Sequence, residues 1–377
     1  MKAVKYPTDP IERSALKNRY IAALSVQKTK GGISWLDYCQ KEWKNIRRKL
    51  PQGKCFPSDI RKILKAEYSK LIGYYNHYIK IENAISEKDK DKLKFIFSYD
   101  IFHDAIAGFF MDASNDFDLR VCHYCGISYI NKYSVSGDAI GLERINYADK
   151  NELGKLLHIK TPKTLQSIYD HQPYVAPSDF NHVVRFRSRD KFHSIFPATV
   201  DKNHFDLDHV LDKGSCPITA ISLMNFVPSC SVCNEKLKKQ KALGSWKKPI
   251  EELSPTSPKF DFDHQVEFVL MPKPGKKIGN RPTQQSDDYE LKMDVKKPEY
   301  EHFIRIFHLR ERYLFHKMEA LFWLEIKRRY TDSRIAMIAT ALTDPEYTPQ
   351  RIKEDIFQIP LDQRTRCFEK LKRDMLK

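Results

Sequence analysis

The sequence predicts a mostly helical α+β protein, with a small metal-binding α+β module between two helical regions. Apolar residues at helical spacing occupy both ends of the chain, within residues 10–118 and from residue 299 onward. Between them, residues 119–250 concentrate cysteines, histidines, turn residues and strand-like runs such as "HVVRFRSRDKF". The 377 residues are enough for two or three structural units. The expected organisation is a helical region at 1–118, the module at 119–250, an extended hairpin with a basic loop at 251–298, and a helical region at 299–377.

The N-terminal region contains two strong helix signals. The stretch "DIRKILKAEYSKLIGYYNHYIKIENAI" has apolar residues at spacings of three and four, namely Ile60, Ile63, Leu64, Tyr68, Leu71 and Tyr75. The stretch "DKDKLKFIFSYDIFHDAIAGFFMDAS" is dense in Phe and Ile, which predicts a more buried helix leading to the first cysteine pair. We interpret the aromatic stripe as core, and not as a surface on which bases stack.

The C-terminal part contains a hairpin signal followed by helix signals. Two alternating runs, "QVEFVLM" and "YELKMD", flank the Gly-, Pro- and Lys-rich loop "PKPGKKIGNRPTQQSDD", which predicts an extended hairpin. The stretch "YEHFIRIFHLRERYLFHKMEALFWLEIKRRY" then predicts long helices. Its apolar residues in helical register are Phe303, Ile306, Phe307, Tyr313, Leu314, Met318, Leu321 and Ile326.

Composition favours a polyanionic partner and gives no sign of a membrane. The chain has 65 Lys and Arg residues against 49 Asp and Glu residues, and such an excess attracts polyanions. No apolar run reaches the roughly 18 residues that a membrane span needs. The start of the chain, "MKAVKYPTDPIERSALKNRY", lacks the apolar stretch of a secretory signal. We therefore expect a cytoplasmic protein in a reducing compartment.

The eight cysteines favour metal binding over disulfide formation. Four of them form two C-x-x-C pairs and the others stand singly, which is a poor disulfide framework for so long a chain. The pairs lie in "VCHYCGISYI" and "SCSVCNEKL", and their members are Cys122, Cys125, Cys230 and Cys233. Two such pairs supply the four thiolates of a closed, tetrahedral, structural Zn²⁺ site. A single site requires residues 126–204 to loop out of the module and return.

A second group of polar residues lies beside the second cysteine pair. Asp208 offers a carboxylate oxygen, and Asn234 offers an amide oxygen, the ligand types that Mg²⁺ or Mn²⁺ prefers. Asp206 would share a strand face with Asp208 and suits an outer partner of that metal. His209 is a base whose pKa ordinarily lies near neutrality. Such a base beside a metal suits phosphodiester hydrolysis, because the base takes a proton from water while the metal offsets charge on the phosphate.

The order Asp208-His209, then Asn225, then Asn234 resembles the HNH endonucleases, whose ββα-metal motif is a short hairpin followed by a helix. The resemblance covers residues 205–239 together with "CHYCG" upstream. It implies that "FDLDHVL" is the first strand and carries the general base His209, and that the side chain of Asn225 holds the His-bearing backbone in place. It also implies that "CNEKLKKQKAL" is the helix, with Asn234 in the place of the final His of the family name. The implied activity is Mg²⁺- or Mn²⁺-dependent cleavage of DNA to 5′-phosphate and 3′-hydroxyl ends.

The wider layout is similar to a narrower group of HNH proteins. A Phe-rich helix leads to "CHYCG", and a C-terminal helical region follows the motif. This order is similar to HNH effectors of prokaryotic defence systems, such as Septu-like and retron-associated nucleases. The likeness implies a role in antiviral defence. It also implies control by a partner ATPase or sensor protein, because an unregulated nuclease would damage its host.

Two groups of basic residues are candidates for contacts with DNA phosphates. Such contacts fix position and give salt-dependent affinity without reading sequence. One group lies on the expected motif helix and the other on alternate positions of "VVRFRSRDK": Lys236, Lys238, Lys239 and Lys241, and Arg185, Arg187 and Arg189. For each of them, a solvated surface position is the alternative interpretation.

Two other functions stay open on the sequence alone. One is a zinc-dependent nucleic-acid-binding module in which Asp208-His209 has no catalytic role, and the other is a nuclease that cleaves RNA. Metal-dependent nicking of DNA separates the first of these from an endonuclease.

Overall fold

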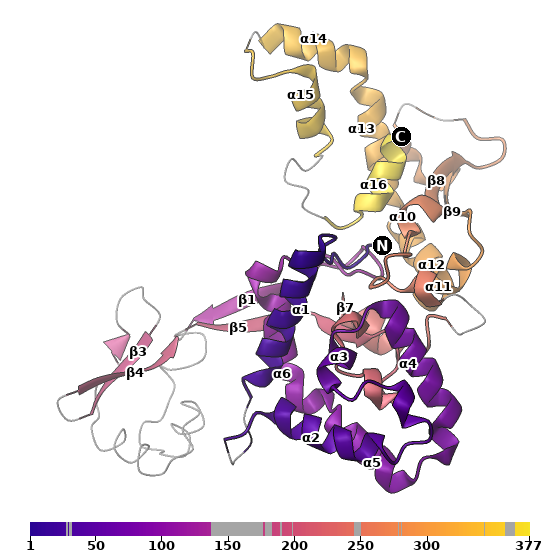
Figure 1. Cartoon of the computed structure of the whole chain (residues 1–377). Coiled ribbons are helices and arrows are strands. Elements are labelled where there is room, and N and C mark those ends of the chain that lie inside the picture. The colour runs from indigo at the N-terminus through magenta and orange to yellow at the C-terminus, as the bar shows by residue number, and fades with distance from the viewer. Residues whose placement is uncertain are drawn as a thin grey trace. The chain divides into compact units, whose positions relative to one another are not determined.

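The computed structural model describes residues 1–27, 29, 32–136, 176–177, 183–188, 191–197, 199–244, 250–277, 279, 281–342, 344–358 and 366–377. The chain folds into two compact units, one formed by residues 1–131 together with 205–377, and one formed by residues 132–204 (Figure 1). The fold is mostly helical with small sheets, as the sequence predicts. The helical ends of the chain and the motif segment between them therefore belong to one unit. The second unit is an insertion in the sequence of the first.

Helices build the N-terminal part of the first unit. They are α1 (Pro10–Ser25), α2 (Trp35–Arg47), α3 (Ile60–Leu64), α4 (Tyr68–Ile81), α5 (Glu87–Ile96) and α6 (Tyr99–Met111), with short 3₁₀ turns η1 (Gly53–Cys55), η2 (Glu82–Ala84) and η3 (Ala113–Asn115). The Asp9 carboxylate accepts hydrogen bonds from two backbone N–H groups in the first turn of α1, and Pro10 has no N–H to leave unsatisfied. The predicted apolar stripe is buried, apart from a half-buried Tyr75, but it is divided between α3 and α4.

The motif segment forms a hairpin followed by a helical turn. Strand β6 (Asp206–His209) pairs antiparallel with β7 (Phe226–Ser229), with His209 opposite Phe226. The connection between the strands contains the 3₁₀ turns η5 (Pro217–Thr219) and η6 (Leu223–Asn225), and the π-helix η7 (Val232–Lys238) follows β7.

The N-terminal helices hold this connection. The Tyr20 hydroxyl on α1 donates to the Ile221 carbonyl at 2.9 Å, and the Ser222 hydroxyl donates to the Ile63 carbonyl of α3 at 3.2 Å. The connection is therefore packed inside the unit and does not project from it as a free loop.

The C-terminal part contains a second hairpin and several helices. Strands β8 (Val266–Pro272) and β9 (Tyr289–Val295) pair antiparallel along their whole length, on the two alternating runs that predict a hairpin. The helices are α9 (Ile250–Leu253), α10 (Phe262–Gln265), α11 (Tyr300–Ile306), α12 (Leu309–Phe315), α13 (Lys317–Arg329), α14 (Asp332–Leu342), α15 (Pro349–Ile356) and α16 (Glu369–Leu376), with the 3₁₀ segment η8 (Pro282–Asp288) before β9.

The long helix pattern that begins near residue 299 is broken twice. His308, at φ 47°, separates α11 from α12, and His316 separates α12 from α13. After each break a new helix begins, so the spacing of core-facing positions does not continue across the break. Leu314 and Met318, predicted to be apolar core positions, are consequently 50% and 48% exposed.

The second unit is described in part. Strand β1 (Asn131–Ser136) pairs with β5 (Thr199–His204), and β2 (Ala176–Pro177), β3 (Val183–Ser188) and β4 (Lys191–Pro197) form an antiparallel sheet in the order β2-β3-β4. The strand-like run of the sequence corresponds to β3 and the start of β4. Arg185 and Arg187 lie in β3, opposite Ser194 and Phe192, whereas Arg189 lies outside the described residues.

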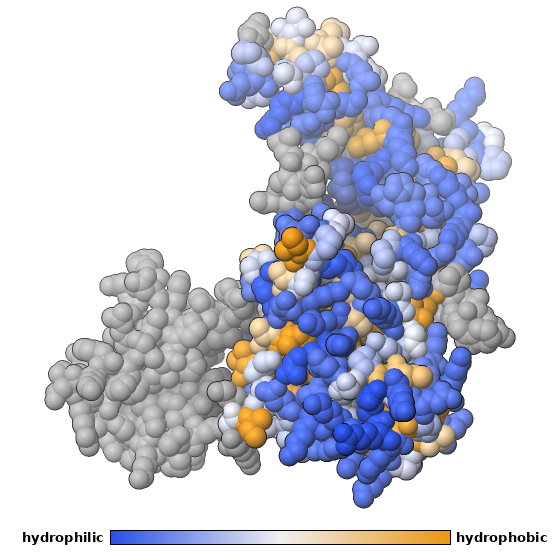
Figure 2. Space-filling view, viewed as in Figure 1, coloured by the Kyte–Doolittle hydropathy of each residue, from blue (hydrophilic) through white to orange (hydrophobic). Residues whose placement is uncertain are grey.

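One apolar core joins the N-terminal helices, the motif hairpin and the C-terminal helices of the first unit. Hydrophilic residues cover most of the surface that Figure 2 shows in colour. Among the helices of the described segments, none has both the length and the apolar character needed to cross a bilayer.

Candidate functional site

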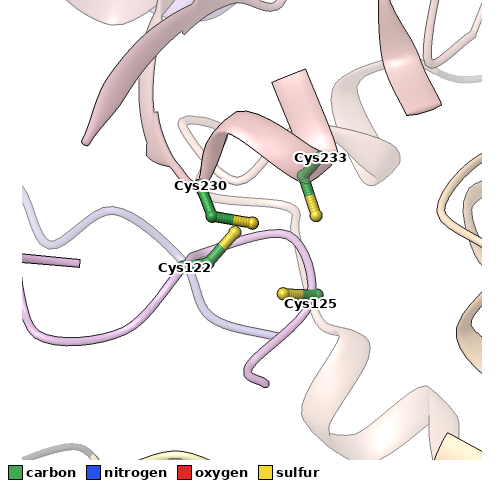
Figure 3. A group of neighbouring side chains, drawn as sticks. All are labelled: Cys122, Cys125, Cys230 and Cys233. Carbon is green, nitrogen blue, oxygen red and sulfur yellow. The ribbon is translucent and has the colours of Figure 1, made fainter. Parts of the chain in front are cut away.

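The four paired cysteines come together in one buried cluster. Their sulfur atoms all lie within 4.8 Å of one another, and Figure 3 shows them pointing toward a common centre. A tetrahedral zinc with Zn–S bonds of about 2.3 Å places its sulfurs roughly 3.8 Å apart. The cluster therefore fits a structural Zn²⁺ ion, as the spacing of the two C-x-x-C pairs predicts. Residues 132–204 form the separate unit that this pairing requires between Cys125 and Cys230.

The first cysteine pair lies in a tight backbone turn. The Gly126 N–H donates to the Cys122 carbonyl at 2.9 Å, and the Ile127 N–H points at the Cys125 sulfur at 3.5 Å. The Arg312 guanidinium on α12 donates to the Cys233 sulfur at 3.3 Å. N–H donors and a positive charge both stabilise thiolates, which is the form of cysteine that binds a metal.

Gly126→Ala is expected to destabilise this turn. Gly126 has φ +65°, and a Cβ atom there would lie 3.2 Å from the Tyr313 hydroxyl oxygen. The left-handed conformation alone costs a residue with a Cβ about 1–2 kcal/mol, so the free energy of unfolding should fall by at least about that amount in a urea titration. Gly108→Ala is the control, because Gly108 lies within α6 and no atom of the described segments lies within 4 Å of its Cβ position. That change should leave stability unchanged or raise it by up to about 1 kcal/mol; equal losses in the two variants would contradict the prediction.

His209 is half-buried and packs against two aromatic rings. Its ring contacts those of Tyr99 and Phe226 edge to face, with centroids 4.9 and 5.0 Å away. The Nε2 atom is buried and has no hydrogen-bond partner among the described residues. Burial lowers the pKa of His209 to about 3, and the nearby charges of Lys213 and Lys238 act in the same direction. The imidazole is therefore neutral near pH 7 and can accept a proton at a buried nitrogen.

Asn225 is fully buried and its amide fixes the backbone that follows His209. The side-chain NH₂ donates to the carbonyls of Leu211 and Thr219, both at 3.0 Å, and the side-chain oxygen accepts from the Leu211 N–H at 2.7 Å. Three hydrogen bonds from one side chain, at net values of about 1 kcal/mol each, hold both ends of the connection between β6 and β7. The HNH resemblance implies that this side chain holds the His-bearing backbone, and the bonds that it makes are to residues that follow His209.

Asp208 and Lys238 form a buried ion pair. The Lys238 Nζ lies 2.9 Å from Asp208 Oδ1, and the Tyr124 hydroxyl donates to Asp208 Oδ2. Asp208 is 3% exposed and Lys238 is 2% exposed. Burial raises the pKa of Asp208, while the Lys238 ammonium and the Tyr124 hydroxyl oppose that rise. Lys238 is therefore an interior residue, which corrects the expectation that it meets DNA phosphates from the surface.

The expected Mg²⁺ ligand pair does not fit this arrangement. A Mg²⁺ ion bound to Asp208 would lie about 2.1 Å from a carboxylate oxygen. Both carboxylate oxygens already accept hydrogen bonds, and the Lys238 ammonium would repel a second cation there. Asn234 is half-buried in η7, where its backbone carbonyl accepts a hydrogen bond from the Lys239 N–H. The structure thus brings Asp208 to a lysine and not to a vacant metal position.

The remaining basic candidates on η7 and just after it are exposed. Lys236, Lys239 and Lys241 all face solvent. Two residues that sequence reasoning missed lie beside His209: Tyr99 at the start of α6, and Lys213, whose Nζ lies 4.8 Å from the centre of the Tyr99 ring. Tyr124 was also missed, although its place inside the first C-x-x-C pair ties it to the cluster. Nothing in the sequence marks Tyr99 or Lys213, because their role depends on the packing of α6 against the hairpin.

We compared the chain with models of known protein families, with curated proteins and with solved structures, and found no match.

Proposed function

We propose that this chain is an HNH-type endonuclease that hydrolyses phosphodiester bonds in DNA, with His209 as the general base. The observation that carries the proposal is the buried Nε2 of His209, which lies on a short antiparallel hairpin and has no hydrogen-bond partner within the described part of the chain. The hairpin leads directly into the half of the cysteine cluster formed by Cys230 and Cys233, and a helical segment follows. Hairpin, base, clamping amide and cysteine cluster occur in the order that the HNH resemblance implies.

The chemistry of the neighbouring residues supports this role. A neutral imidazole accepts the proton of an attacking water at Nε2 while the water oxygen bonds to phosphorus and the 3′ oxygen leaves. A pKa of about 3 makes His209 a weak base in the free protein. A phosphate bound beside the ring would raise that pKa, because a nearby negative charge favours the protonated form. Lys213, above the Tyr99 ring, would contact such a phosphate.

Incubation with supercoiled plasmid tests the proposal. Purified protein with Mg²⁺ or Mn²⁺ should convert supercoiled plasmid to nicked or linear forms, and the products should carry 5′-phosphate ends. A parallel sample is treated with EDTA and then assayed for zinc. This distinguishes loss of Mg²⁺ or Mn²⁺ from loss of the structural zinc. Absence of any cleavage by zinc-loaded, folded protein with either ion would contradict the proposal.

A second candidate function is a non-catalytic zinc-dependent nucleic-acid-binding module. The observations that favour it are the engagement of Asp208 by Lys238 and the packing of His209 against Tyr99 and Phe226. Such a module would bind DNA or RNA with the same salt dependence and leave both uncut. Labelled single-stranded RNA in the same assay distinguishes an RNA-cleaving nuclease from the proposed DNA endonuclease.

Changing Lys236, Lys239 and Lys241 together to Ala is expected to reduce the salt dependence of DNA binding. All three are exposed on or just after η7, and each neutralised phosphate contributes about 0.9 to the slope of log K against log salt concentration. The slope should therefore become shallower by up to about 2.7, as measured by fluorescence anisotropy. The matched control changes Lys88, Lys92 and Lys94, which are exposed on α5, to Ala. If the two triple variants lose equal slope, η7 is not the DNA-contacting surface.

A further inference from the structure

Lys238 is a buried cation that no surface role explains. Its ammonium donates to Asp208 Oδ1 and to the His209 carbonyl, both at 2.9 Å. Asp208 in turn accepts from Tyr124, which lies between the first two cysteines of the cluster. One network therefore connects η7, the end of β6 that carries His209, and the first cysteine turn.

The π-helical form of η7 is what brings Lys238 to this position. Residues in a π-helix bond to the residue five positions away, as the Lys239 N–H does to the Asn234 carbonyl at 2.8 Å. Residues five apart then lie on nearly the same side, whereas in an α-helix they point about 140° apart. Cys233 and Lys238 are the two buried residues of η7 and are five apart. The same side of η7 thus contributes Cys233 to the cysteine cluster and Lys238 to the ion pair with Asp208.

The charges at this position favour an ammonium ion over a divalent metal. A buried carboxylate needs a positive or hydrogen-bonding partner, since an unpaired buried charge is strongly destabilising. Lys238 and Tyr124 supply these partners to Asp208, one to each oxygen. The ammonium also donates a hydrogen bond to the His209 backbone carbonyl, a contact that a Mg²⁺ ion bound to Asp208 would not require. The position that the sequence assigns to a metal ion is therefore filled by the chain itself.

We propose that Lys238 is the resident cation of Asp208 and a positioning residue for His209. Asp208 then binds no divalent ion, and any Mg²⁺ that the reaction requires is held without it. Lys238 donates to the His209 carbonyl and so fixes the backbone at His209, as Asn225 fixes the backbone that follows. The positioning part of this inference rests on the proposed nuclease function, whereas the ion pair and the exclusion of metal from Asp208 do not.

Unfolding of the full chain tests the ion pair without reference to activity. Urea midpoints are measured for the zinc-loaded wild type, Lys238→Met, Asp208→Asn and the double variant, with and without Mg²⁺. We expect each single variant to lower the midpoint and the double variant to lower it by less than the sum, because the second change removes the stranded charge. Any shift of the midpoint that Mg²⁺ causes in the wild type should be the same in Asp208→Asn, because Asp208 binds no divalent ion. Lys239→Met, next in the chain and exposed, is the matched control and should unfold near the wild-type midpoint.

Two results would overturn the inference. One is additivity of the two single variants, which would mean that Asp208 and Lys238 do not interact. The other is a Mg²⁺-dependent rise of the wild-type midpoint that Asp208→Asn abolishes, which would make Asp208 a metal ligand. If Lys238→Met does not fold, Mn²⁺ binding to wild type and Asp208→Asn, followed by electron paramagnetic resonance, decides the same question. Equal binding supports the inference, and loss of a Mn²⁺ site in Asp208→Asn overturns it.

Cleavage kinetics test the positioning role separately. In folded Lys238→Met, kcat should fall while the Mg²⁺ concentration for half-maximal cleavage stays unchanged, because the variant disturbs His209 and no metal ligand. A raised Mg²⁺ requirement would contradict this part. If the wild type cuts nothing, the nuclease proposal fails, and the unfolding and Mn²⁺ measurements still decide the ion pair.

Discussion

His209→Ala is expected to abolish DNA cleavage while zinc content and DNA binding are retained. In the proposed mechanism the imidazole deprotonates water, and a positioned base typically contributes roughly 10²- to 10⁴-fold to the rate. Its buried Nε2 has no hydrogen-bond partner among the described residues. Removal of Nε2 therefore leaves no other polar group there without its partner. Nicking of supercoiled plasmid at saturating Mg²⁺ is the measurement, and the loss should take the activity below detection on a gel.

The control for this prediction must separate catalysis from packing. The His209 ring fills space between Tyr99 and Phe226, so its removal also lowers stability. His209→Gln retains more of the side-chain volume and should be similarly inactive at temperatures where both variants are folded. His264→Ala, at an exposed position on α10, should cut like the wild type. Wild-type rates in folded His209→Ala would remove His209 as the base and the HNH proposal with it.

Cys233→Ser is expected to remove the zinc and, with it, the stable fold. Wild-type protein should contain about one zinc per chain, because four thiolates close one tetrahedral site. Binding of structural zinc contributes about 10–16 kcal/mol in small zinc domains, which is comparable to the entire stability of a typical protein. Elemental analysis should therefore find little zinc in the variant, and circular dichroism should show a loss of cooperative unfolding.

Cys216 provides the matched control for the cysteine cluster. It is also fully buried and unpaired, but lies outside the cluster. Burial raises the pKa of the Cys216 thiol to about 12, so it remains a protonated, apolar side chain. Cys216→Ser should keep its zinc and lose only the stability that comes from burying a hydroxyl. A zinc-free wild type that unfolds cooperatively would show that the cysteine cluster is not a metal site.

The features that the sequence predicts well are those set by local spacing. The two C-x-x-C pairs predict one four-sulfur cluster across a long separation, because each pair is half a tetrahedral site and neither half is complete alone. Apolar residues at spacings of three and four predict the buried faces of α3 and α4. Alternation of apolar residues coincides with the paired strands β8 and β9.

The features that the sequence does not predict depend on breaks in regular spacing. His308 and His316 divide the C-terminal helix pattern, and neither residue is a strong helix breaker by itself. The π-helix turns Lys238 inward, to nearly the same side as the buried Cys233, while Lys239 is exposed. In a helix of 3.6 residues per turn, Lys238 would point about 140° away from Cys233. The ion pair with Asp208, and the contact of His209 with α6, follow from packing between distant segments.

The separation of the two cysteine pairs by the whole second unit has a consequence during translation. About a hundred residues lie between Cys125 and Cys230, so a ribosome that adds roughly 5–20 residues per second delivers the second pair roughly 5–20 s after the first. Until then the nascent chain has half a zinc site and lacks β6, β7 and η7. The growing polypeptide consequently lacks the candidate site, although helices α1–α6 have already been synthesised. On the proposed function, prematurely terminated chains that end within the second unit would lack the general base His209 and would leave the nucleic acid of the cell uncut.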